Sequence, residues 1–101
     1  FYLQKLAFLC MIYNMKIVLT DHAKKRIKER GISANIVKES LMFPDNVDTS
    51  TVDKNRYLVK KIYFHEKFRK KHLLMIVCEK EKSKVVKVIT IIDTSKIDKY
   101  F

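Results

Sequence analysis

The hydrophobic period of this chain changes at Pro44. Before it, apolar residues recur at the three- and four-residue spacing of helices, and after it they alternate at about every second residue. The alternation predicts four strands joined by short polar links, at residues 47–52, 56–64, 73–79 and 85–92. With a short strand at residues 16–19, we expect a two-layer α+β fold in β-α-α-β-β-β-β order. Two helices would cover one face of a mainly antiparallel sheet, and the other face would stay open for a ligand.

A short basic helix is predicted between Thr20 and Gly31. Thr20 suits a helix N-cap, and Gly31 suits the left-handed residue that ends a helix. At about 100° per residue, His22, Arg26 and Arg30 fall on one face of this helix, beside an apolar edge. The face is either a solvated basic surface or a phosphate-binding site, and both interpretations stay open at this point.

A second helix is expected to follow at once. Ser33 is a cap candidate, and Ile32 and Val37 have the spacing of a hydrophobic staple. The helix should end at Phe43, because the residue before a proline avoids the helical region. A last short helix is predicted within residues 94–101.

Residues 1–14 are apolar but too few to span a bilayer. The chain begins with Phe1, and Met15 directly precedes the first predicted strand. We interpret residues 1–14 as a leader that comes from an expression vector or an upstream start, and residues 15–101 as a single domain. The alternative is a genuine helix that packs on the domain, or on a second copy to make a homodimer.

The charge of the chain indicates a polyanionic partner. Its 101 residues carry 22 Lys and Arg against 11 Asp and Glu, a formal charge of +11, which favours RNA, the ribosome or an acidic protein. A membrane is not expected, because the basic residues do not follow one long amphipathic helix. Cys10 and Cys78 lie far apart without further ligands at metal spacing, which predicts a reducing, cytoplasmic location and no metal or cofactor.

Three stretches resemble a known family. The segments TDHAKKRIKERGIS, KVIT and KYF, with the predicted element order, are similar to the RelE/ParE toxin superfamily, most closely its BrnT-like branch, and the resemblance covers Met15–Phe101. It implies a RelE-like toxin of a type II toxin-antitoxin system, bound by a cognate antitoxin. In the RelE branch it also implies an mRNA endoribonuclease that often works in the ribosome. ParE-like proteins act on gyrase, so the activity has to be argued from the site.

Metal-independent RNA cleavage needs a base, cations for the phosphate and a proton donor. His22 is the acid-base candidate, since an imidazole titrates nearest neutral pH, and Arg26 and Arg30 would hold the phosphate. The alternative is that His22 only caps its helix or donates to a carbonyl, while the arginines pair with Asp93 or Asp98.

Four further residues are catalytic candidates. Lys60 or Lys61 would add charge from the sheet, Thr90 would supply a hydroxyl, and Tyr100 would donate a proton or stack on a base. Their structural alternatives are edge protection for the lysines, core packing for Thr90 and simple packing for Tyr100.

The loop at residues 65–72 is a candidate RNA-binding segment. It gathers four cations around one aromatic ring, which suits single-stranded RNA, although a solvated hairpin tip has the same composition. The expected contacts are Lys67, Phe68, Arg69, Lys70 and Lys71. No metal site is predicted from His65, Glu66 and His72, because their spacing is not that of standard ligands. A non-catalytic nucleic-acid-binding protein on the same fold is the alternative function.

Overall fold

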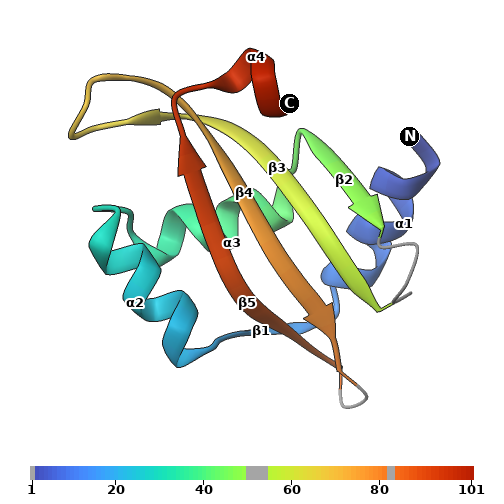
Figure 1. Cartoon of the computed structure of the whole chain (residues 1–101). Coiled ribbons are helices and arrows are strands. Elements are labelled where there is room, and N and C mark those ends of the chain that lie inside the picture. The colour runs from blue at the N-terminus through green and yellow to red at the C-terminus, as the bar shows by residue number, and fades with distance from the viewer. Residues whose placement is uncertain (1, 50–54, 82–83) are drawn as a thin grey trace.

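A five-stranded mixed sheet forms the centre of the molecule (Figure 1). The computed structural model describes residues 2–49, 55–81 and 84–101. The strands lie in the order β1-β5-β4-β3-β2; only β1 and β5 pair in parallel, and the other neighbours pair antiparallel. Their bounds are β1 Lys16–Leu19, β2 Asn46–Thr49, β3 Arg56–His65, β4 Lys70–Lys80 and β5 Val85–Thr94. The predicted α+β class and mainly antiparallel sheet are confirmed.

Three helices, and not the predicted two, cover one face of this sheet (Figure 1). They are α1 Tyr2–Ile12, α2 Asp21–Glu29 and α3 Ala34–Met42. Phe8 and Ile12 of α1 are buried in the same core as Val37 and Leu41 of α3. Residues 1–14 thus include a helix that packs on the domain, as the alternative interpretation expected. That the native domain starts at Met15 stays a prediction.

The predicted ends of α2 and α3 are confirmed, because each depends on nearby residues. The Thr20 hydroxyl accepts from Ala23 N at 3.0 Å, and the Ser33 hydroxyl accepts from Ile36 N at 3.3 Å. Gly31 has φ +66° and donates to Lys28 O, while Ile32 donates to Ile27 O. These two bonds form a Schellman motif, which ends α2 and turns the chain into α3.

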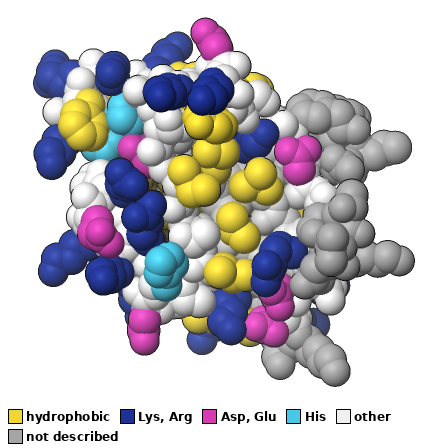
Figure 2. Space-filling model, in the orientation of Figure 1, with side chains coloured by type: hydrophobic (Ala, Val, Ile, Leu, Met, Phe, Trp, Pro, Cys, Tyr) yellow, Lys and Arg dark blue, Asp and Glu magenta, His cyan; other side chains and the backbone are white. Residues whose placement is uncertain are grey.

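The second face of the sheet carries a helix at one end, so the prediction of a fully open face is wrong. A short helix, α4 Ile97–Tyr100, contacts β4. Leu73 of β4 points away from α1–α3 by its register and is nevertheless fully buried, which places α4 over this end of the face. Lys96 N donates to the Thr94 hydroxyl just before α4. The rest of the face exposes apolar side chains at the centre of Figure 2.

Strands β3, β4 and β5 extend further than the alternation predicted. β3 and β4 meet in a tight hairpin whose turn is residues 66–69, so that part of the expected basic loop is strand. Of the predicted strand at 47–52, residues 50–52 lie outside the described residues. No helix in the described part of the chain is long and apolar enough to cross a membrane.

Candidate functional site

The start of α2 is attached to the edge of β5 by one threonine. β1 pairs only with residues 85–88 of β5, so the later part of β5 has a free edge, and α2 packs against it. The Thr20 hydroxyl, besides capping α2, donates to Ile89 O at 3.0 Å, and Thr20 N donates to Val88 O at 3.2 Å. The first turn of α2 therefore lies beside the point where the register between β4 and β5 shifts, at Val77 and Cys78 of β4.

This attachment brings His22 to Thr90. The two atoms His22 Nε2 and Thr90 Oγ1 lie 3.1 Å apart, the imidazole is exposed and Thr90 is half-buried. Thr90 had core packing as its structural alternative, and its contact with His22 is instead open to solvent. A substrate can reach both groups.

Arg26 and Arg30 follow His22 by one and two turns on the same side of α2. Neither side chain forms an ion pair within residues 2–49, 55–81 and 84–101, so the predicted alternative of pairing with Asp93 or Asp98 is wrong for the described structure. Figure 2 shows basic side chains along this margin of the molecule, between two histidine surfaces. Both guanidiniums keep donors available for an anion.

A polar cavity of about 320 Å³ continues from the end of α2 toward the β3–β4 hairpin. It joins the basic margin to buried groups at the end of β5. Its lining comprises Glu29, Arg30, Lys67, Phe68, His72, Asp93, Thr94 and Ser95.

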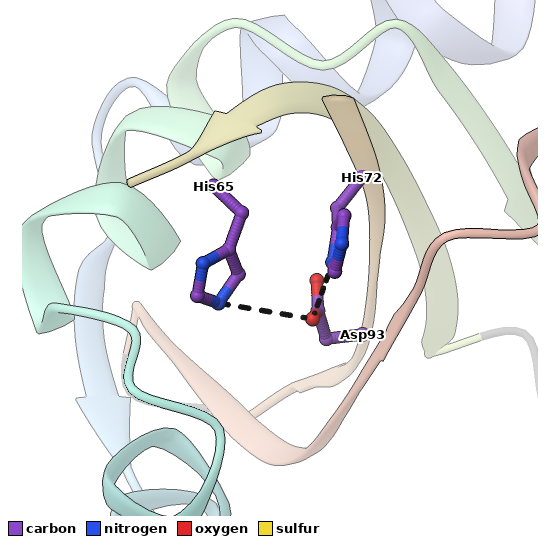
Figure 3. Close-up of side chains that lie close together, drawn as sticks. All are labelled: His65, His72 and Asp93. Carbon is purple, nitrogen blue, oxygen red and sulfur yellow. Dashed lines mark hydrogen bonds and ion pairs between the residues drawn. The ribbon is translucent and has the colours of Figure 1, made fainter. Parts of the chain in front are cut away.

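His72 and Asp93, which line this cavity, belong to a buried polar cluster that also includes His65 (Figure 3). His72 Nδ1 lies 2.8 Å from Asp93 Oδ2, and the Tyr63 hydroxyl donates to Asp93 Oδ1 at 2.6 Å. His65 Nε2 lies 4.0 Å from Asp93 Oδ2 and donates to the Arg30 carbonyl oxygen at 3.0 Å. We name His65, His72 and Asp93 the His-Asp cluster.

The environment of Tyr63 keeps its hydroxyl protonated. Burial is the largest cause that raises the Tyr63 pKa, and the hydrogen bond to Asp93 and the negative charge of Asp93 raise it further. The phenol therefore acts as a permanent donor that orients the carboxylate.

The hairpin presents the predicted RNA-binding cations outward. Lys67, Arg69, Lys70 and Lys71 are all exposed. Phe68 is 53% exposed, but its ring stacks on His72 at 5.3 Å between centroids, with 11° between the ring planes. One face of the ring thus covers the His-Asp cluster, and only the remainder is available to a base.

The structure does not bring Lys60, Lys61 or Tyr100 to His22. Lys60 and Lys61 lie on β3, two strands from β5, and their ammonium groups lie 3.6 Å from the carboxylates of Asp48 and Asp45 respectively. Tyr100 lies on α4, with Lys99 Nζ 5.3 Å from its ring centroid. The predicted grouping with His22 is therefore corrected: the strand order separates Lys60 and Lys61 from β5, and Tyr100 lies on a helix that contacts β4.

The spacing of the histidines in the sequence does not reveal the His-Asp cluster. His65 and His72 are seven positions apart, yet the hairpin pairs Tyr63 with His72 and His65 with Lys70, which places both imidazoles on one face. The register also pairs Leu74 with Asp93. A turn placed at residues 66–69 would have predicted that the two histidines meet.

Comparison with known protein families gives a match over most of the chain. A family model described as "Domain of unknown function (DUF4258)" matches residues 19–93. This range runs from the end of β1 to Asp93 and includes His22, Thr90 and the His-Asp cluster. No curated protein and no solved structure matches the chain.

Proposed function

Since the chain belongs to the DUF4258 family, whose description names no activity, we propose from its own geometry that it is a metal-independent endoribonuclease. It would act as the toxin of a type II toxin-antitoxin pair, as the resemblance to RelE-like proteins implies. The observation that carries this proposal is the 3.1 Å contact between His22 Nε2 and Thr90 Oγ1, which is open to solvent. Beside it lie two arginines that form no ion pair within the described residues.

His22 is the proposed base. Its imidazole takes the proton of an RNA 2′-hydroxyl, and the 2′-oxygen attacks the adjacent phosphorus. Arg26 and Arg30 bind the non-bridging oxygens, on which negative charge builds, and Thr90 holds the imidazole in place. The 5′-oxygen leaves and takes the proton back from the imidazolium. The products are a 2′,3′-cyclic phosphate and a 5′-hydroxyl.

The test is induced expression of the full chain in a bacterial host, with growth and mRNA ends measured together. We expect growth arrest and new 5′-hydroxyl ends, both lost in His22→Ala and reduced in Thr90→Val. Lys24→Ala is the matched control, because it removes a cation from the opposite side of the same helix. Arrest that persists unchanged in His22→Ala would contradict the proposed site.

Binding without cleavage is the second candidate function. It is favoured by the exposed hairpin cations, which need no chemistry to hold RNA. In that case the purified chain would bind single-stranded RNA at low salt without cleaving it. The His22→Ala variant would bind this RNA with the same affinity as the wild type.

A partner protein belongs to the proposal. An antitoxin would neutralise part of the +11 charge and cover the face of the sheet that exposes Phe64 (51%) and Ile92 (41%). Co-expression of the cognate antitoxin should then relieve the growth arrest, and the two chains should purify together.

A further inference from the structure

We propose that the His-Asp cluster binds a divalent transition-metal ion of the zinc class. The ligand atoms would be His65 Nε2, His72 Nδ1 and Asp93 Oδ2, which come from β3, β4 and β5 (Figure 3). Two imidazoles with one carboxylate are a donor set that Zn²⁺ uses in proteins. The inference does not rest on the proposed ribonuclease, whose reacting groups lie on α2 and at Thr90.

The spacing of the donors fits such an ion. One ligand atom from each residue lies within 4.8 Å of those of the other two. Metal–ligand bonds of about 2.0–2.1 Å in tetrahedral geometry place ligand atoms roughly 3.4 Å apart. The separations from Asp93 Oδ2 are 2.8 Å to His72 and 4.0 Å to His65. Shifts of less than an ångström would therefore bring each of these pairs to the required spacing.

The charge of the cluster also calls for a cation. The Asp93 side chain is only 5% exposed, and no Lys or Arg in the described part of the chain forms an ion pair with it. Its two ion-pair partners within the described residues are His72 and His65, which carry a positive charge only when they are protonated, and a buried carboxylate beside neutral imidazoles is costly. A divalent ion held by neutral imidazoles would balance it.

The two nitrogens of each imidazole would have different roles in the proposed site. His65 Nδ1 and His72 Nε2, the outer nitrogens, have no hydrogen-bond partner within the described residues, so each can carry the proton that a neutral imidazole keeps when its other nitrogen binds a metal. When the ion takes the two inner nitrogens, each imidazole stays neutral and carries its proton on the outer one. The metal then takes the place of two hydrogen-bonded protons, the one between His72 Nδ1 and Asp93 and the one between His65 Nε2 and the Arg30 carbonyl oxygen.

The surroundings supply the orientation and the entry that a metal site needs. Tyr63 donates to Asp93 Oδ1 and so directs Oδ2 toward the histidines. His72 and Asp93 line the 320 Å³ cavity, through which an ion can reach them and a water can complete its coordination. Phe68 covers the imidazoles from outside.

The experiment titrates the untagged, chelator-treated full chain with Co²⁺ and then displaces it with Zn²⁺. We expect one ion per chain and a visible absorption band typical of tetrahedral cobalt, which Zn²⁺ abolishes. His72→Gln and Asp93→Asn should lose the band. His22→Gln should keep it, because His22 is the one histidine of the sequence that lies outside the cluster. Tyr63→Phe should weaken binding about 10- to 100-fold.

A measurement on the unaltered protein keeps the proposal falsifiable if these buried variants do not fold. The ¹⁵N resonances of the three imidazoles are followed while Zn²⁺ is added. Shifts confined to His65 and His72 at one equivalent support the site and identify the bound nitrogens. No saturable change, or a change centred on His22, would overturn it and leave a His72–Asp93 hydrogen bond that is only structural.

Discussion

Thr20 performs two tasks with a single hydroxyl. The oxygen accepts from Ala23 N to start α2, and its hydrogen is donated to Ile89 O of β5. The helix start and its position on the sheet therefore depend on the same atom. Because His22 is two residues further on, the distance from its imidazole to Thr90 depends on Thr20 as well.

Thr20→Ala should destabilise the protein by about 1–2 kcal/mol, since it removes a helix cap and a second hydrogen bond. Thr20→Ser, which keeps the hydroxyl, should be much less destabilised. Urea unfolding measures both. A Thr20→Ala variant within about 0.5 kcal/mol of the wild type would be in the range of an ordinary surface change and would contradict this role.

The thiol of Cys78 makes the stability of the protein depend on pH in the alkaline range. Burial raises the pKa of its thiol from 9.0 to about 12. The unfolded thiol therefore loses its proton first, so the contribution to stability is complete below about pH 9 and falls as the pH rises toward 12. Between pH 8 and 11, the free energy of unfolding should decline more steeply for the wild type than for Cys78→Ala. Parallel curves would exclude the linkage.

A thiol reagent should modify exposed Cys10 in the native protein and Cys78 only after unfolding.

At the scale of the element, the turn between α2 and α3 depends on the single glycine of the chain. Gly31 has φ +66°, and a Cβ built there would lie 3.6 Å from Lys67 Cδ and 4.0 Å from His65 Cε1. These are ordinary van der Waals distances, so the cost of a side chain comes from the backbone conformation alone.

Gly31→Ala should accordingly cost about 1–2 kcal/mol, the penalty of a left-handed conformation for an L-residue. Gly31→Asn should cost less, because asparagine tolerates this region better. Thermal unfolding of the two variants orders them. If both were destabilised equally, a steric cause would have to replace the conformational one.

The elements that sequence reasoning predicts well are those determined by neighbouring residues. The caps at Thr20 and Ser33 and the left-handed Gly31 each involve contacts within a few positions, which a sequence displays directly. The strand order depends on distant pairing instead. For that reason, sequence reasoning wrongly places Lys60 near His22. It also misses the His-Asp cluster, which forms only through the register of the β3–β4 hairpin and the pairing of β4 with β5.

At the scale of the whole molecule, part of the +11 charge is concentrated at one end. Four exposed cations lie close together at one hairpin, where Arg69, with φ 52°, closes the turn through a 2.7 Å bond from its N–H to His65 O. This end of the molecule should carry most of the phosphate interactions, and Arg26 and Arg30 lie on the adjoining margin.

Replacing Lys67 and Lys71 together by glutamine should reduce the salt dependence of single-stranded RNA binding. Removing one ionic interaction with a phosphate makes the slope of log K against log salt shallower by about 0.7, so the two lysines together account for about 1.4. Lys16→Gln with Lys38→Gln is the matched control, since it changes the net charge equally at exposed positions elsewhere. Equal slopes in the two double variants would show that binding follows net charge alone.

The parallel pairing of β1 with β5 has a consequence for biosynthesis. β1 and α2 are synthesised before β5, the strand to which both are attached, and Thr90 follows His22 by 68 residues. At about 5–20 residues per second, several seconds of translation separate the two. For the proposed ribonuclease, the nascent chain therefore has no complete active site until β5 has been synthesised and has paired with β1.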